Sequence, residues 1–291
     1  MDINYELYKV FYHVANTLSF SEASKQLFIS QSAVSQSIKV LEKKLNQPLF
    51  IRSTKRVQLT PEGEILLKHI EPAMNLIRQG ENQLLEANTL NGGQLRIGAS
   101  DTICRYYLVS YLKDFHRRYP NVHIKVTNQT SIACAKLLES GQVDFAITNY
   151  PNSGLSNTQN VRIIREFKDV FVANDEYKEL RGKTISLKDL KRFPILMLDR
   201  KSTTSEFLHA MFQRSHLDLV PEIELSSNDL LIDLARIGLG IAFVPDFCIP
   251  TDDKDLFVVK LKEELPKRQM VVAYNERMPL SQTAKQFMSM L

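Results

Sequence analysis

Hydroxyl, amide and ammonium side chains are concentrated in residues 29–45. If this stretch is a helix, its apolar side chains fall on one face at the spacing of an amphipathic helix; they are Val34, Ile38, Leu41 and Leu45. The opposite face then carries Ser32, Ser35, Gln36, Lys39 and Lys43. In a DNA major groove, such hydroxyls and amides reach base edges and lysines reach phosphates. An ordinary solvated helix also has a polar face, so the neighbouring elements must decide between the two interpretations.

The preceding residues predict two further helices and a tight turn. Apolar residues recur at helical spacing over residues 4–18, and Ser21 is a suitable N-cap for a short helix over residues 22–28. Ser30 can cap the helix that follows, after a connection of very few residues. Two helices joined by such a turn, the second with a polar and basic face, predict a helix-turn-helix.

A two-stranded hairpin is predicted behind these helices, over residues 48–60. Its apolar ends flank a polar tip at residues 52–56, as expected of two short strands and their turn. A hairpin at this place would form a wing beside the recognition helix. Arg52, Lys55 and Arg56 would then be positioned to contact the phosphate backbone or the minor groove.

The charge distribution supports a nucleic-acid contact in the same segment. Residues 1–60 contain eight Lys or Arg against four Asp or Glu, and this excess of +4 equals the net charge of the whole chain. Residues 61–291 therefore carry no net charge. A positive surplus confined to one segment is the electrostatic pattern of a surface that binds a polyanion.

Four segments of this region resemble the N-terminal region of LysR-type transcriptional regulators. They are residues 18–27 (LSFSEASKQL), 30–45 (SQSAVSQSIKVLEKKL), 49–52 (LFIR) and 59–63 (LTPEG). Ser24 stands where the family usually has Ala, and Asn46 where a Gly usually ends the recognition helix. Both changes are mild, because Ser is small and Asn tolerates a left-handed backbone. The resemblance implies a winged helix-turn-helix domain (residues 1–60) that binds a pseudo-palindromic promoter site in double-stranded DNA. The residues expected to contact that DNA are Gln31, Ser32, Ser35, Gln36, Lys39, Arg52, Lys55 and Arg56.

A long helix is predicted to follow, with Thr60 as N-cap and Pro61 at its first position, and to run to about residue 87. Its apolar side chains are Leu66, Ile70, Ala73, Met74, Ile77, Leu84 and Leu85. Such a stripe needs a partner, and a second copy of the helix is the simplest one. The resemblance likewise implies that residues 61–90 form a linker through which the chain makes a homodimer or homotetramer. Pro72 lies inside the helix and should kink it or loosen one turn.

Residues 91–291 show strands alternating with helices, a pattern that favours parallel strands joined by crossover helices. The expected strands are 94–99, 123–128, 143–148, 169–173, 195–198, 222–225, 241–245 and 270–274. The expected helices are 102–119, 131–140, 187–192, 203–215, 228–237 and 281–290. The pattern is similar to the two-lobed, periplasmic-binding-protein-like effector domain of the LysR family, most closely at residues 238–245 (GLGIAFVP). This implies one lobe of about residues 91–164 and 268–291, and another of about 165–267.

Hydroxyl and amide residues stand at the predicted strand-to-helix junctions. Ligands of open α/β sheets bind beyond the carboxyl ends of strands, where helix N-termini favour anions. The candidate effector-binding residues are Ser100, Thr102, Thr130, Ser131, Asn149, Ser202, Thr203 and Asn228. Each could instead simply cap its helix. We expect a small carboxylate or oxyanion metabolite, while the carboxylate of Asp101 leaves an amino acid or another polar metabolite open.

Other classes of protein fit the sequence less well. It has no glycine-rich phosphate loop, no nucleophile elbow and no clustered metal ligands. We therefore expect no catalytic residues, no metal and no cofactor. The alternatives are a solute-binding protein and, less favoured, an enzyme.

The three cysteines, Cys104, Cys134 and Cys248, are scattered along the chain, which argues against disulfides or a zinc site; a redox role stays open for them. The chain has no secretion signal or bilayer-spanning run, so we expect a cytoplasmic protein. RNA polymerase stays open as a partner.

Overall fold

The structure is a computed structural model and describes residues 3–52, 56–87, 93–157, 159–251, 253–276 and 278–291. The chain divides into two compact units. The first consists of residues 1–88 together with 140–142, and the second of residues 89–139 and 143–291. Within the described residues, no helix is both long enough and apolar enough to cross a membrane.

Three helices form the start of the first unit: α1 (Tyr5–Thr17), α2 (Phe20–Leu27) and α3 (Gln31–Leu45). Asn4, Ser19 and Ser30 cap them through their side chains. The expected cap of α2, Ser21, is wrong: the Ser19 hydroxyl accepts the hydrogen bond from the Glu22 amide at 3.2 Å. Ser19 has the extended backbone of an N-cap, at φ −149° and ψ 117°, so Phe20 is already part of the first turn. The ring centroid of Phe20 lies 5.9 Å from that of Phe50.

The predicted apolar face of α3 is buried except at its end, where Leu45 is half-buried. Val34, Ile38 and Leu41 are fully buried and pack with Phe11 of α1. Asn46 ends α3 in the left-handed conformation, at φ 52°, which Asn adopts at less cost than most residues. The burial of this apolar face fixes which side of α3 turns to solvent.

A hairpin and a long helix complete the first unit. Strands β1 (Phe50–Arg52) and β2 (Val57–Leu59) pair antiparallel, and α4 (Pro61–Ala87) follows. The Thr60 hydroxyl accepts a hydrogen bond from the Gly63 amide at 2.9 Å, as an N-cap does. The helix continues through Pro72. Among the side chains of α4 that the structure describes, Ile65, Leu76, Ile77 and Leu84 are large, apolar and exposed in this single chain.

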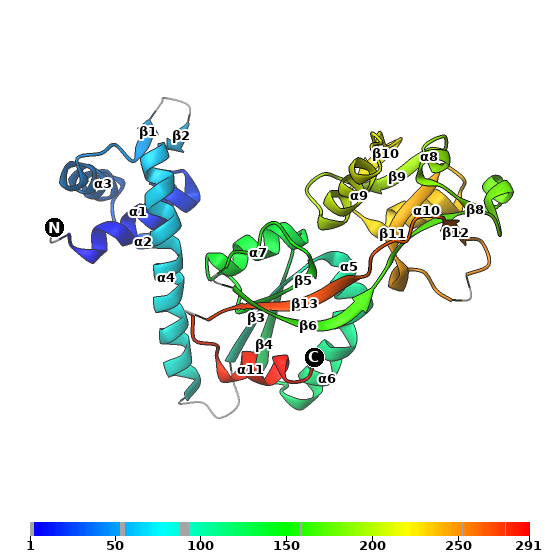
Figure 1. The fold of residues 1–291 in the computed structure, drawn as a ribbon. Coiled ribbons are helices and arrows are strands. Elements are labelled where there is room, and N and C mark those ends of the chain that lie inside the picture. Colours follow the sequence, from blue (N-terminus) through cyan, green and yellow to red (C-terminus); the bar gives the residue numbers. More distant parts are fainter. Residues whose placement is uncertain (1–2, 53–55, 88–92, 158, 252, 277) are drawn as a thin grey trace. The chain divides into compact units, whose positions relative to one another are not determined.

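The second unit contains two lobes, each built on one sheet (Figure 1). The first lobe has the strand order β4-β3-β5-β13-β6. Its strands are β3 (Gly93–Ala99), β4 (Val122–Asn128), β5 (Phe145–Tyr150), β6 (Gln159–Phe167) and β13 (Arg268–Asn275). Its helices are α5 (Asp101–Ile103), α6 (Val109–Arg118), α7 (Ser131–Glu139) and α11 (Gln282–Met288). A π-helical turn, Cys104–Leu108, joins α5 to α6.

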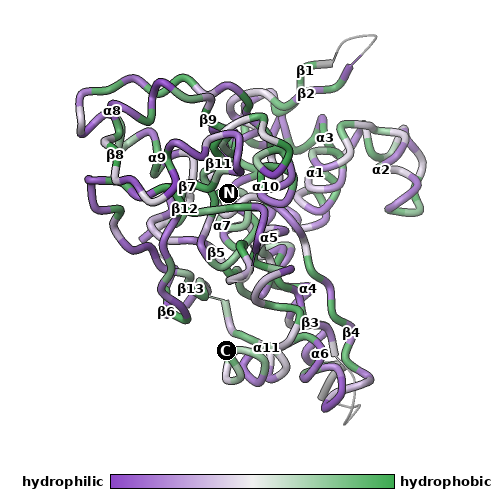
Figure 2. Tube along the Cα trace, turned by 90° about the vertical axis from the view of Figure 1, so that its right-hand side faces the viewer, coloured by the Kyte–Doolittle hydropathy of each residue, from purple (hydrophilic) through white to green (hydrophobic). Residues whose placement is uncertain are grey.

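The second lobe has the strand order β10-β9-β11-β7-β12-β8. Its strands are β7 (Asp169–Ala173), β8 (Thr184–Ile185), β9 (Ile195–Leu198), β10 (Ile223–Leu225), β11 (Ile241–Pro245) and β12 (Phe257–Leu261). Its helices are α8 (Leu187–Leu190), α9 (Thr203–Arg214) and α10 (Asn228–Arg236), with 3-10 turns at Asp175–Leu180 and Asp246–Cys248. The central strands, such as β11, are buried along their whole length and apolar (Figure 2).

The sheets are mixed, which corrects the expectation of parallel strands. Strands β4, β3 and β5 are parallel, as are β10, β9 and β11. However, β13 runs antiparallel to β5 and β6, and β7 antiparallel to β11 and β12. The antiparallel strands include those through which the chain passes between lobes, since β6 leads into β7 and β12 into β13. The crossing strand β6 was missed because its exposed edge position allows polar and charged residues.

Candidate functional site

A pocket of about 280 Å³ lies between the two lobes, at the carboxyl ends of their strands. The first lobe contributes Ser100, Asp101, Thr102, Asn128, Gln129, Thr130, Ser131 and Asn149. The second contributes Leu198, Asp199, Ser202, Thr203, Thr204, Ser226, Ser227 and Asn228. All eight residues predicted to bind an effector therefore line this pocket. The parallel strands explain this, because their carboxyl ends lie at one edge of each sheet.

Several of these hydroxyls also cap helices. Ser100 accepts a hydrogen bond from the Ile103 amide at 3.3 Å, and Thr130 accepts one from Ala133 at 3.3 Å. Ser202 accepts one from Ser205 at 3.1 Å. Capping leaves a hydroxyl with its own proton and a second lone pair, so these side chains can cap a helix and also face a ligand. The two interpretations of the sequence are compatible at these positions.

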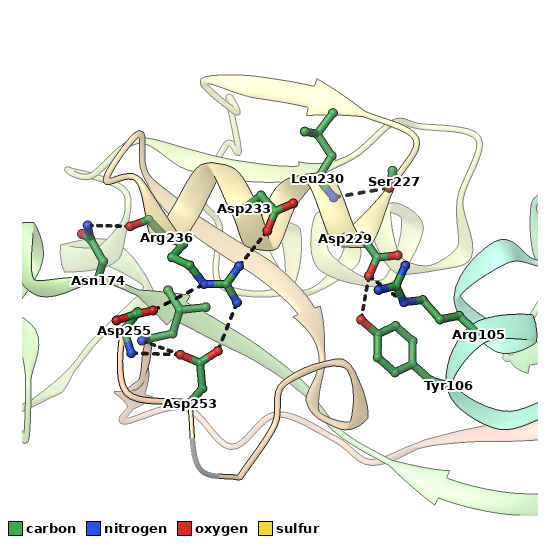
Figure 3. Close-up of polar contacts among 11 residues, drawn as sticks. Arg105, Tyr106, Asn174, Ser227, Asp229, Leu230, Asp233, Arg236, Asp253 and Asp255 are labelled. Carbon is green, nitrogen blue, oxygen red and sulfur yellow. Dashed lines mark hydrogen bonds and ion pairs between the residues drawn. The ribbon is translucent and has the colours of Figure 1, made fainter.

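Two residues at the start of α10 contact the first lobe. The side-chain amide of Asn228 donates a hydrogen bond to the Thr102 hydroxyl at 2.9 Å. The Tyr106 hydroxyl donates one to a carboxylate oxygen of Asp229 at 2.6 Å, and the guanidinium of Arg105 lies 3.4 Å from the same carboxylate (Figure 3). Burial raises the pKa of Tyr106, and its bond to Asp229 raises that pKa further, so the phenol stays protonated and remains a donor.

The backbone of the first lobe has an unusual conformation at this contact. Tyr106 lies in the π-helical turn Cys104–Leu108. A π-bulge inside an α-helix is rare and is frequent at functional sites. Here it lies between α5, whose Thr102 faces the pocket, and α6, and it carries the tyrosine that reaches the second lobe.

The pocket contains carboxylates but, among its lining residues, no Lys, Arg or His. Asp101 is exposed and accepts a hydrogen bond from Asn128 at 3.4 Å, and Asp199 is half-buried and accepts one from the Lys201 amide at 3.0 Å. Positive potential in the pocket comes instead from the N-termini of α7, α9 and α10, which begin at Ser131, Thr203 and Asn228.

The amide oxygens of Asn149 and Asn228 have no hydrogen-bond partner, although these residues are 8% and 4% exposed. Buried polar atoms are normally paired. Both residues line the pocket, so two residues of its wall carry an acceptor whose hydrogen-bonding capacity is unused.

A buried ion pair supports the second lobe's side of the pocket. Arg268, at the start of β13, lies 2.8 Å from Asp169, at the start of β7, and both are almost fully buried. The same guanidinium donates hydrogen bonds to the hydroxyls of Thr203 at 3.0 Å and Thr204 at 3.1 Å. Burial raises the pKa of Asp169, and the Arg268 guanidinium opposes that rise. Sequence reasoning missed this pair, because no local pattern connects residues 99 positions apart.

The thiols have raised pKa values. Burial and the nearby Asp101 carboxylate raise the pKa of Cys104 to about 11. Burial raises the pKa of Cys134 to about 12 and also raises that of Cys248. Because the thiolate is the reactive form of cysteine, these surroundings do not favour a reactive thiol.

The first unit presents the polar face of α3. Gln31, Ser32, Gln36 and Lys39 are exposed and Ser35 is half-buried. Of the three basic residues predicted for the wing, Arg56 is exposed, while Lys55 and the side chain of Arg52 lie outside the described residues.

Two protein-family models match the chain. "Bacterial regulatory helix-turn-helix protein, lysR family" covers residues 5–64, and "LysR substrate binding domain" covers residues 88–291. A probable RuBisCO transcriptional regulator of Trichormus variabilis is 31% identical over 231 residues, which are 78% of this chain and 68% of that protein.

Solved structures share the fold. Full-length CbnR in complex with its target DNA superposes with a TM-score of 0.66 at 17% identity, covering 99% of this chain and 98% of that one. The regulatory domain of CcmR from Synechocystis PCC6803, in complex with 2-PG, superposes with a TM-score of 0.62 at 21% identity, covering 68% of this chain and 95% of that domain.

Proposed function

The chain belongs to the LysR family of transcriptional regulators, and from this we propose that it binds promoter DNA through α3 and is controlled by a small metabolite held between the lobes of its second unit. The observation that carries the proposal is the pocket itself. Hydroxyl and amide side chains from both lobes and three helix N-termini converge on it.

The polar face of α3 supports the DNA-binding part. Its exposed hydroxyl, amide and ammonium groups have the chemistry that major-groove base edges and phosphates require. We assign base contacts to Gln31, Ser32, Ser35, Gln36 and Lys39. We assign backbone or minor-groove contacts to Arg52, Lys55 and Arg56. The similar fold of CbnR, solved with its target DNA, supports the same arrangement.

We propose that the effector is a small polar or anionic metabolite that contacts Ser100, Thr102, Thr130, Ser131, Asn149, Ser202, Thr203 and Asn228. The bound 2-PG in the CcmR domain supports a ligand of this size and polarity. Because the lining residues include neither a His–carboxylate pair nor a thiol, we propose recognition rather than catalysis for this pocket.

For the assembly, we propose that the exposed apolar side chains of α4 pair with a second copy of the chain. The protein would then be a homodimer or homotetramer on a pseudo-palindromic site, with half-sites one helical turn or a multiple apart. RNA polymerase is a further proposed partner, and the cytoplasm, where bacterial DNA lies, is the proposed location.

DNA binding is tested by fluorescence anisotropy on a fragment of the chain's own promoter at several salt concentrations. Replacing Lys55 or Arg56 with Gln should weaken binding to every sequence and reduce the salt slope by about one unit per lost contact. Gln31→Ala should relax sequence preference. Lys113→Gln, an exposed change in the second unit, is the control. If the full-length protein does not bind DNA even at low salt, the result would support the alternative interpretation that the chain is a solute-binding protein.

Effector binding is tested by thermal unfolding against amino acids, dicarboxylates, aromatic acids, sulfur compounds and phosphosugars. A ligand at a hundredfold over its dissociation constant stabilises by about 2.7 kcal/mol. Thr102→Val should reduce that stabilisation and leave DNA affinity unchanged, because it removes one hydroxyl from the pocket. A panel without any stabilising compound would contradict the metabolite-binding part of the proposal, and loss of DNA affinity in Thr102→Val would show that Thr102 is structural.

A further inference from the structure

We propose that the metabolite recognised in this pocket is a zwitterion of amino-acid size, with an ammonium group as well as a carboxylate. The inference rests on the proposed function of the pocket and names the chemical class of its ligand.

The charge of the lining residues argues against a ligand that is only anionic. Asp101 and Asp199 line the pocket, and the lining includes no Lys, Arg or His that would balance them. Like charges close together in a partly desolvated site repel strongly. A dianion would meet this repulsion without any side-chain cation among the lining residues to offset it, whereas an ammonium group would be attracted by both carboxylates.

The unpaired amide oxygens supply the second observation. Asn149 comes from the end of β5 in the first lobe and Asn228 from the start of α10 in the second. Both residues are more than nine-tenths buried, both line the pocket, and the oxygen of each side chain has no partner. An ammonium group has three donors and no acceptor. It therefore satisfies acceptors of this kind, which a carboxylate or phosphate oxygen cannot do.

The pocket also contains groups that can bind the carboxylate of a zwitterion. The N-termini of α7, α9 and α10 favour negative charge, and the hydroxyls of Ser100, Thr130 and Ser226 line the same pocket. These groups suit a carboxylate. The volume of about 280 Å³ suits a small molecule, because pockets for drug-sized ligands are about 300–1,000 Å³.

Matched pairs of compounds test the ammonium group directly. The melting temperature and calorimetric affinity of the full-length protein are measured with alanine and lactate, serine and glycerate, aspartate and malate, and glutamate and 2-hydroxyglutarate. Each pair differs in an amino group against a hydroxyl. The remaining common amino acids and 2-PG complete the set. We expect an amino acid to bind at least tenfold more tightly than its hydroxy acid, and more tightly than 2-PG.

Two variants identify the carboxylates involved. Asp101→Asn and Asp199→Asn should each weaken binding of that amino acid severalfold and improve binding of 2-PG, since each removes a negative charge from the pocket. Asp114→Asn, at an exposed position on α6, is the matched control and should change neither affinity.

The outcomes separate this inference from the proposed function. If a hydroxy acid or 2-PG binds as tightly as every amino acid, the zwitterion is wrong and the metabolite pocket stands. If no amino acid binds, the zwitterion is again wrong, and the wider panel described above decides whether the pocket binds any metabolite. If an amino acid binds but both Asp variants bind it unchanged, the ammonium is not recognised as proposed.

Discussion

The hydroxyl of Tyr106 lies 2.6 Å from a carboxylate oxygen of Asp229 and joins the two lobes of the second unit beside the pocket. On the neighbouring residue of α10, Asn228 bonds to Thr102 inside the pocket. Thr102 and Tyr106 are four residues apart on one helical segment. The two hydrogen bonds therefore lie next to each other and both connect this segment to the start of α10. A ligand that contacts Thr102 or Asn228 acts directly on this interlobe contact.

Tyr106→Phe removes the hydroxyl that donates a hydrogen bond to Asp229. A hydrogen bond to a charged group contributes about 1.5–3 kcal/mol, so amide exchange in the first turn of α10 should rise at least about tenfold in the ligand-free protein. Hydrogen-exchange mass spectrometry measures it. The control is Tyr119→Phe, since Tyr119 ends the same helical segment and packs on Phe115 within the first lobe. Equal exchange in the wild type and in Tyr106→Phe would show that this bond does not hold the lobes together.

Breaking the buried ion pair between Asp169 and Arg268 should strongly destabilise the fold. Asp169→Asn leaves the Arg268 guanidinium buried without its counter-charge, and we expect a loss of about 3–5 kcal/mol in the free energy of unfolding. Urea denaturation followed by circular dichroism measures it. Replacing both residues, Asp169→Leu with Arg268→Met, should cost clearly less than the sum of the two single changes.

The neighbouring surface pair provides the control for this experiment. Lys267 and Glu166 lie 2.9 Å apart, but their side chains are 61% and 54% exposed. Glu166→Gln should therefore change stability by less than about 1 kcal/mol. If Glu166→Gln and Asp169→Asn lowered the free energy of unfolding by similar amounts, burial would not explain the expected cost of breaking the Asp169–Arg268 pair.

Arg236 should stabilise the second lobe in a pH-dependent way. Burial raises the pKa of Asp253, but the bonds from Arg236 and from the amides of Asp255 and Leu256 outweigh it, so the net pKa is lowered (Figure 3). A lowered pKa stabilises the fold above the unfolded-state value of about 3.9, and this stability is lost as the pH falls through the folded value.

Arg236→Gln should therefore destabilise the protein by about 1 kcal/mol at pH 7, and the difference from wild type should shrink below about pH 4. Urea denaturation at a series of pH values measures both. Arg117→Gln, which disturbs an exposed pair with Asp114, should have little effect at either pH. A constant difference across the whole range would contradict the role of Asp253.

Phe28 occupies a strained position in the turn before α3. Its φ is 56° and its side chain is 95% exposed. The left-handed conformation costs most residues about 1–2 kcal/mol and Asn less, so Phe28→Asn should raise the free energy of unfolding by up to about 1 kcal/mol. Thermal and urea unfolding measure it. Ile29→Asn, an exposed apolar residue next to it without positive φ, should give no such gain. Destabilisation by Phe28→Asn would show that the aromatic ring has a packing role.

The sequence by itself determined the local structure and the family. The amphipathic period of α3, the caps at Ser30 and Thr60, and the confinement of excess charge to residues 1–60 are properties of neighbouring residues, and periodicity and composition report them directly. The strand-to-helix junctions are also local. Parallel strands bring their carboxyl ends to one edge of a sheet, so the pocket-lining residues Ser100, Thr130 and Ser202 could be named before the structure was known.

Only the tertiary structure decided how distant residues meet. The pairing of β13 with β5 and β6, the ion pair between Arg268 and Asp169, and the bond from Tyr106 to Asp229 join positions about 100 or more residues apart. No local pattern encodes such partners, because the same strand or helix propensity is compatible with many pairings. Burial then determines how much these contacts contribute to stability. A carboxylate or an amide oxygen without a partner costs free energy only when the folded chain has removed water from it.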